Sequence, residues 1–355
     1  GAAAGREIRL PTDRGSFDGH FAANDVWPYA AFMTTDTDPV GATCERADFM
    51  GYMHTPRTPQ ALEDRADLPP GGEQRGIDPA GAFQWNLDLA PGAAESIVVL
   101  TGVTPADASP PSLDTARAAD AERASAAWWE EVMDTLTVHT PDPSLDRFVN
   151  YWNKYQMMIN NWFGRGPSYF HKDQYPAMRD CCQDAFGVLP VAPEATRAKL
   201  VRIFGFVFQD GRIGKGCNRV RYEEEPTDKA DLALWMVLAL KAYLVETGDA
   251  SILDETVPFL DGGASTLYEH LLTAVQRVID ERGAHGLPLI RNGDWNDALD
   301  RIGDQGRGES VWLGQFLYYT LNELTDVLAK KGDTARIETY RAVAGTLREN
   351  LEACH

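Results

Sequence analysis

The amino-acid sequence predicts an α+β protein of more than one domain, with a β-rich N-terminal portion and a helical C-terminal portion. The chain has 355 residues, which exceeds the size of one typical domain. Short apolar segments separated by Pro and Gly occupy its first part, as in β structure. Apolar residues at helical spacing occupy the rest. We therefore expect three parts, at residues 1–105, 106–141 and 142–355.

The β-rich part contains two candidate strands joined by a turn. Residues 83–89 alternate apolar and polar side chains, as a half-buried strand does. The sequence Ala90-Pro91-Gly92 predicts a turn, and the apolar residues 97–100 predict the next strand. Clustered Pro and Gly between residues 56 and 81 indicate long surface loops.

A linker and a series of helices follow. Residues 104–114 are rich in Pro, Ala, Ser and Asp, and an alanine-rich helix is expected at 114–133. A helix is expected to open at Pro143, and further helices are expected at 181–190, 193–209, 228–247, 262–281, 309–330 and 333–354. Long loops rich in Gly and aromatic residues separate them. Repeated helix–loop–helix units of this kind suggest a helical toroid, although other helical bundles have the same period.

Composition excludes several functional classes. A net charge of −20 argues against nucleic acid or an anionic membrane as a partner. The five cysteines show no CxxC spacing, so a disulfide framework or zinc site is not expected, and no metal site is predicted. The apolar run 232–244 contains Lys241 and is too short to span a bilayer. The first residues do not resemble a signal peptide, and we expect a cytoplasmic protein.

The segment from Arg291 to Asp300 is the densest group of candidate functional residues. It contains three carboxylates, at Asp294, Asp297 and Asp300, together with the indole of Trp295 and the amide of Asn296. Carboxylates and amides bind sugar hydroxyls, an aromatic ring stacks on a pyranose, and one carboxyl can deliver a proton. The alternative is an Asx-rich turn that caps the next helix.

Residues 178–184 form a second candidate cluster. If they open a helix, Asp180 and Asp184 lie on one face at i and i+4, beside Arg179. Such carboxylates could clamp adjacent sugar hydroxyls, with the arginine keeping one of them ionised. The alternative, a salt-bridged first turn on the surface, is the more common arrangement.

Two further positions have ordinary structural interpretations. Glu309 follows two glycines at a helix start, where it could contact a ligand or simply be an N-terminal helix acid. Asp231 and Trp235 are interpreted as residues of the core or the rim.

Three motifs in order resemble glycoside hydrolase family 94, which contains the cellobiose, chitobiose and cellodextrin phosphorylases and related cyclic β-1,2-glucan synthase domains. Residues 179–184 (RDCCQD) resemble the RDxxQD motif of the family, and residues 292–297 (NGDWND) resemble its DWND loop. Residues 308–313 (GESVWL) match a third segment. The resemblance covers essentially the whole chain.

The resemblance implies an N-terminal β-sandwich, a helical linker and an (α/α)6 barrel that holds the active site. The helices after residue 142 are fewer than a closed barrel of six hairpins needs. We therefore expect a partial barrel, with the phosphate-binding residues of the family lying beyond residue 355.

The resemblance also implies inverting phosphorolysis of a β-linked gluco-configured di- or oligosaccharide to an α-sugar 1-phosphate. By motif position Asp297 is the general acid. The expected substrate-binding residues are Arg179, Asp180, Asp184, Asp294, Trp295, Asn296 and Glu309. No cofactor is expected. The expected partners are a carbohydrate substrate and inorganic phosphate, which acts as a co-substrate. The resemblance is also compatible with assembly of this protein as a homodimer.

Two other functions remain as alternatives. An inverting hydrolase on the same toroidal fold would need a second carboxylate about 6.5–9.5 Å from Asp297 to activate water. A truncated, non-catalytic chain that binds carbohydrate is the other.

Overall fold

The computed structural model describes residues 7–11, 29–64, 67–69, 79–105, 107–111, 114–163, 177–214, 226–227, 229–299 and 302–354. The chain forms two compact units, Gly1–Trp129 and Glu130–His355. The division falls inside the long helix α3 (Thr115–Asp134), which the alanine-rich segment predicted. The three-part division expected from the sequence stays a prediction.

The first unit contains two small antiparallel sheets. One has the strand order β1-β2-β5, and the other pairs β3 with β4. Their bounds are β1 Glu7–Pro11, β2 Tyr29–Thr35, β3 Gly41–Glu45, β4 Pro79–Gln84 and β5 Val99–Pro105, with short helices α1 Arg46–Met50 and α2 Gln60–Glu63. Ala42 and Cys44 of β3 are buried, and Met33 and Phe83 pack against them. Ala42 and Cys44 are two positions apart on β3, so their side chains point to the same face of the sheet.

The expected strand at residues 83–89 is largely wrong, because β4 ends at Gln84. Beyond this point Leu87 and Leu89 are 52% and 50% exposed, so their alternation does not create a buried face. Trp85 instead donates its indole N–H to the carbonyl of Thr37, 3.2 Å away. The chain leaves the sheet until β5 begins at Val99, two residues later than the sequence suggested.

The second unit is built from helices and short hairpins. The expected helices are confirmed to within a few residues at most of their ends. Their bounds are α4 Pro143–Arg147, η2 Phe148–Asn153, α5 Lys154–Phe163, α6 Met178–Val188, α7 Pro193–Phe204, α8 Leu232–Thr247, η3 Ala250–Asp254, α9 Leu267–Asp280, η4 Asp297–Leu299, α10 Val311–Lys331 and α11 Thr334–Ala353. The short strands are β6 Ile213–Gly214, β7 Pro226–Thr227, β8 Thr256–Pro258 and β9 Ala264–Thr266. Among the described helices, none is both long and apolar enough to cross a membrane.

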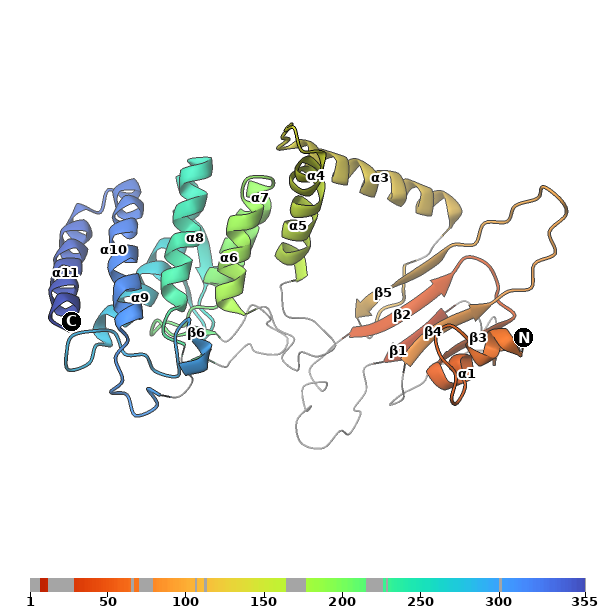
Figure 1. The fold of residues 1–355 in the computed structure, drawn as a ribbon, viewed down its shortest axis with the longest axis horizontal. Helices are drawn as coiled ribbons and strands as arrows, with labels where there is room; N and C mark the ends of the chain where they lie inside the picture. Colours follow the sequence, from red (N-terminus) through yellow and green to blue (C-terminus); the bar gives the residue numbers. More distant parts are fainter. Residues whose placement is uncertain are drawn as a thin grey trace. The chain divides into compact units, whose positions relative to one another are not determined.

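The helices of the second unit pair in chain order, and α8 lies at their centre. The pairs α6–α7, α8–α9 and α10–α11 pack against each other, and α8 also contacts α6 and α10 (Figure 1). Helix α8 is apolar on nearly all sides, which suits a helix surrounded by neighbours. The main core gathers buried side chains from α6 to α11.

The N-terminal ends of α6, α8 and α10 face one region. Asp231 precedes α8, and Ser310 precedes α10, where its hydroxyl accepts from the N–H of Leu313 at 3.0 Å. The loop residues 290–299 between α9 and α10 lie in the same region. These helix starts fix the backbone on which the candidate site is built.

Candidate active site

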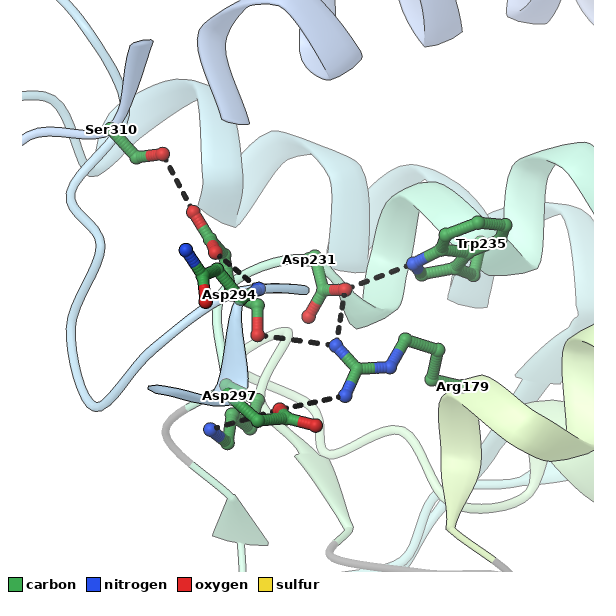
Figure 2. A network of polar contacts seen from close by, with 8 residues as sticks. Arg179, Asp231, Trp235, Asp294, Asp297 and Ser310 are labelled. Carbon is green, nitrogen blue, oxygen red and sulfur yellow. Dashed lines mark hydrogen bonds and ion pairs between the residues drawn. The ribbon is translucent and has the colours of Figure 1, made fainter. Parts of the chain in front are cut away.

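The candidate site joins the first turn of α6, the residue before α8 and the loop 290–299, and Arg179 lies at its centre (Figure 2). The guanidinium Nη1 donates to Oδ2 of Asp231 at 3.0 Å and to the carbonyl of Asp294 at 3.1 Å. Its Nη2 donates to Oδ1 of Asp297 at 2.9 Å. The guanidinium carbon lies 4.6 Å from the ring centre of Trp295. One side chain therefore links both sequence clusters.

Asp231 is the buried anchor of Arg179. It is 0% exposed, and its Oδ2 also accepts from Nε1 of Trp235 at 2.9 Å. In the part of the chain that the structure describes, its Oδ1 has no hydrogen-bond partner. Burial raises the pKa of Asp231, and the nearby Arg179 charge opposes that rise.

The pKa of Arg179 is raised from its ordinary value. Burial acts against the charged guanidinium, but the negative charge of Asp231 and the hydrogen bonds to Asp297 and Asp231 outweigh it. Arg179 therefore stays a cation in a site where its side chain is only 14% exposed.

The loop 290–299 is held by Asp294. This residue is 2% exposed, its Oδ1 accepts from the N–H of Asn296 at 2.9 Å, and its Oδ2 accepts from the Ser310 hydroxyl at 2.6 Å (Figure 2). The backbone turns at Gly293, whose φ of 122° suits glycine, and a Cβ there would lie 2.7 Å from Nζ of Lys229. The Asp294 carboxylate thus ties the loop to the start of α10.

Asp297 presents its carboxylate toward solvent from this loop. Its side chain is 68% exposed, and Oδ1 lies 3.5 Å from Nζ of Lys229 in addition to its contact with Arg179. Trp295 is 45% exposed and packs at 5.5 Å, centre to centre, against Trp235. An exposed carboxylate flanked by two cations and an accessible indole can contact a sugar and exchange a proton with it.

A cavity of about 590 Å³ adjoins Asp297. This volume falls within the usual range of small-molecule sites, about 300–1,000 Å³. Its lining combines polar groups of the loop with apolar side chains, and consists of Ile290, Asp294, Trp295, Asn296, Asp297, Leu299, Ile302, Glu309, Ser310, Val311 and Trp312.

Two of the sequence-predicted carboxylates contact other protein groups, and their binding of a sugar stays a prediction. Asp184 is 6% exposed and lies 3.8 Å from Nζ of Lys199, inside the helical unit. Glu309 lines the cavity, but its Oε1 accepts from the N–H groups of His285 and Leu287, both at 3.0 Å. Burial alone would raise the pKa of Glu309, but the hydrogen bonds from His285 and Leu287 lower it. Both carboxylates are therefore held by protein groups.

The remaining predicted residues lie at the edge of the network. Asp180 is in the first turn of α6 and is partly exposed. Asn296 has an exposed side chain next to Asp297. Whether either contacts a ligand stays a prediction.

Sequence reasoning missed four members of the network: Lys229, Asp231, Trp235 and Ser310. Asp231 and Trp235 had been interpreted as core or rim residues. The local sequence carried no signal for Asp231, because an aspartate directly before a helix is an ordinary N-cap residue.

Comparison with known proteins identifies both units. The family model for the glycosyl hydrolase 94 superfamily catalytic domain matches residues 128–355, and that for the glycosyl hydrolase 94 supersandwich domain matches residues 12–127. The N-terminal unit is therefore a supersandwich domain, and the helical unit is a catalytic domain of this kind.

Curated relatives include phosphorylases and a glucan synthase. The chain is 28% identical over 348 residues to the cyclic beta-(1,2)-glucan synthase NdvB of Rhizobium meliloti (strain 1021), covering 91% of this chain and 12% of that protein. It is 36% identical over 194 residues to solabiose phosphorylase of Paenibacillus borealis, covering 55% of this chain and 24% of the relative. It is 29% identical over 347 residues to the 3-O-beta-D-glucopyranosyl-beta-D-glucuronide phosphorylase of the same organism, covering 92% of this chain and 42% of the relative. The chain thus spans less than half the length of each.

Proposed function

Because the chain belongs to the glycosyl hydrolase 94 superfamily, we propose that this protein is an inverting glycoside phosphorylase with Asp297 as its general acid. Its substrate is a β-linked gluco-configured di- or oligosaccharide, and its products are an α-sugar 1-phosphate and the released acceptor sugar. The relatives named as phosphorylases support the reaction class.

The observation that carries this proposal is the contact between Arg179 and Asp297. Its two atoms are 2.9 Å apart, although the residues are 118 positions apart in the chain. The contact unites two of the three motifs that resemble family 94, and it lies beside the exposed Trp295 and the cavity. This grouping of a carboxylate, a cation and an indole at a cavity fits a sugar site.

In the proposed reaction Asp297 protonates the glycosidic oxygen while phosphate attacks the anomeric carbon from the opposite face. The bond from that carbon to the glycosidic oxygen breaks, and its electron pair takes the proton. A bond from a phosphate oxygen to the anomeric carbon forms, which inverts the β linkage to an α-phosphate. Hydrogen phosphate loses one proton when it becomes the ester, and this proton restores the acid. Phosphate thus replaces the base and water of an inverting hydrolase.

The network around Asp297 suggests roles for its neighbours. Arg179 donates to the Asp297 carboxylate and would stabilise the negative charge that appears there as the proton leaves. Trp295 would stack on the donor sugar, and Asp180 would bind its hydroxyls. Asp294 would act through the loop, because its carboxylate is bonded to Asn296 and Ser310.

We also propose that the helical domain belongs to an (α/α)6 barrel. The successive pairs α6–α7, α8–α9 and α10–α11 alternate as the hairpins of such a barrel do, and α6, α8 and α10 start at the site.

Phosphate dependence tests the proposal. The full-length protein is incubated with β-linked glucose disaccharides in buffers with and without inorganic phosphate. Cleavage that requires phosphate and yields an α-sugar 1-phosphate by NMR supports the proposal. Equal turnover without phosphate would indicate the hydrolase instead, and sugar binding without turnover in either buffer would indicate the non-catalytic chain.

A further inference from the structure

We propose that Asp231 is a positioning residue of this site, which fixes Arg179 in place and balances its charge beside Asp297. This inference rests on the proposed role of Asp297 as the proton donor. Asp231 is 0% exposed, so it acts on the reaction through Arg179 and not by touching the sugar.

The first step of the argument is position. Arg179 has a long side chain with many rotamers, and holding it in one of them costs conformational entropy. Asp231 precedes α8, which is packed on several sides by other helices, and its Oδ2 is itself held by Nε1 of Trp235 at 2.9 Å. The carboxylate is therefore a rigid acceptor for Nη1 of Arg179, and it leaves Nη2 directed at Asp297 (Figure 2).

The second step is that helix capping does not explain Asp231. Although it occupies the N-cap position of α8, its side chain makes no capping hydrogen bond. Its Oδ1 has no hydrogen-bond partner within the described ranges, and a buried polar atom without a partner costs stability. A residue that helps the helix start would use that oxygen to accept a backbone N–H.

The third step is charge. Arg179 lies between two carboxylates, with Asp231 on one side and Asp297 on the other. A cation that no anion balances favours the ionised form of a neighbouring acid, and an ionised acid cannot donate a proton. Before the proton is transferred, the negative charge of Asp231 offsets part of the positive charge of Arg179. Arg179 still hydrogen-bonds the Asp297 carboxylate once the proton has left.

Other charged and titratable groups pack around these three residues. Lys229 precedes α8 and lies 3.5 Å from Asp297. Asp294, on the loop, is bonded to Ser310 and Asn296, and Asp180 follows Arg179 in α6. Cys182 of α6 is fully buried, and burial raises the pKa of its thiol well above the usual value. Among these groups, Asp231 is the fully buried carboxylate that accepts a hydrogen bond from Arg179.

The experiment compares the Asp231→Asn and Asp231→Glu variants with the wild type in the full-length protein. Asp231→Asn keeps an oxygen acceptor but removes the charge, so we expect kcat to fall by about tenfold or more, with a small change in KM for the sugar. The alkaline limb of the pH–rate profile should move toward lower pH, because the negative charge that offsets Arg179 beside the proton donor is gone. Asp231→Glu should restore the limb and part of kcat. An unchanged kcat and profile in Asp231→Asn would overturn the inference.

Trp235→Phe separates position from charge. It removes the indole donor to Asp231 but keeps the carboxylate, so kcat should fall while the alkaline limb stays in place. This variant also serves if Asp231→Asn does not fold, and an unchanged kcat in it would count against the positioning role. The matched control is Asp333→Asn, which removes a helix-start carboxylate bonded to Tyr268 and Arg336, outside the site. It should alter the melting temperature and leave the pH profile unchanged.

A labelling readout keeps this inference separate from the proposed function. Phenylglyoxal modifies arginine, and peptide mass spectrometry reports the rate at Arg179 without any turnover. The Asp231→Asn variant should be labelled several times faster than the wild type, because Arg179 has lost its buried anchor. Equal rates would overturn the inference, whereas a wild type without phosphate-dependent cleavage would overturn the proposed function alone.

Discussion

The two ends of helices α8 and α10 are built on different principles. Their C-terminal ends finish in glycines of left-handed conformation, Gly248 with φ of 69° and Gly332 with φ of 71°. An aspartate follows each glycine and caps the next helical segment: Asp249 accepts from the N–H of Ser251 at 3.0 Å and Asp333 from the N–H of Arg336 at 3.2 Å. The two aspartates therefore accept from backbone N–H groups only two or three positions away.

The N-terminal ends of the same helices carry the candidate site, where side chains distant in the sequence meet. Arg179 reaches Asp231 across 52 positions and Asp297 across 118. The turn at residues 291–293 places a non-glycine residue, Arg291, at φ of 52°. The buried charge of Asp231 is balanced by Arg179, whose side chain is itself only 14% exposed. The comparison teaches that the C-terminal ends are stabilised by local caps, whereas the N-terminal ends hold buried charge and a strained backbone turn, as a functional site often does.

Among the variants considered, Arg179→Met should change activity and stability the most. It removes a donor to Asp297, so activity of the full-length protein should fall by about 100-fold or more. It also leaves Asp231 buried without its cation, which should reduce the free energy of unfolding by about 3 kcal/mol. Steady-state kinetics and chemical denaturation measure the two effects.

The double variant Arg179→Met/Asp231→Asn is the control for that prediction. It should regain most of the lost stability, because no uncompensated buried charge remains, while activity stays low. Recovery of activity together with stability would mean that Arg179 serves the fold alone.

At the opposite end, Asp333→Ala should lower the free energy of unfolding by about 1–2 kcal/mol and leave kcat unchanged. The variant removes the acceptor of Tyr268 and of the first turn of α11. Glu338→Ala, at an exposed position of the same helix, provides the comparison and should be nearly neutral. A reduced kcat in folded Asp333→Ala would contradict the prediction that the C-terminal ends of these helices affect stability alone.

Glycine-to-alanine substitutions should have opposite signs at two sites of this region. Gly248→Ala places a side chain at positive φ and should cost about 1 kcal/mol, although no atom lies within 4 Å of the new Cβ. Gly345→Ala lies inside helix α11, also with open space, and should gain about 0.5–1 kcal/mol. Urea denaturation of both variants checks the prediction, which fails if the two shifts have the same sign.

The smallest expected effect is a pH dependence of stability from His270. This residue is 0% exposed, its ring nitrogens lie 2.9 and 3.0 Å from the carbonyls of Phe204 and Val257, and burial lowers its pKa. A histidine whose folded pKa is lowered binds fewer protons than the unfolded chain, so its contribution to stability is lost as pH falls below about 6.5. Melting temperatures at pH 7.5 and 5.0 should differ less in His270→Gln than in the wild type. An equal difference in both proteins would contradict this.

The sequence predicted the helices better than it predicted the strands. Helices α8 and α10 were expected to within a few residues, because in each a long apolar period ends at a Gly-Asp pair. The strand expected at 83–89 was wrong beyond Gln84, since Leu87 and Leu89 alternate without an apolar layer to cover them. Alternation alone does not say whether a partner surface exists.

The candidate site was predictable only in part, because some of its contacts depend on how helices pack. Residue types and motif resemblance pointed to Arg179, Trp295 and Asp297, and the structure brings these three together. Spacing along a helix could not tell that the Asp184 carboxylate turns toward Lys199. Nor could it find Asp231, because its contact with Arg179 depends on how α6 packs against α8.

The role of Asp297 as proton donor is tested most directly by changing how much the leaving group needs a proton. The full-length wild type and Asp297→Asn are compared on a β-linked glucose disaccharide and on a β-glucoside of an acidic phenol, both with phosphate. We predict that the variant loses about 1,000-fold on the disaccharide and far less on the phenol glucoside, whose leaving group departs without protonation. Equal losses on both substrates, or full activity on the disaccharide, would contradict the account.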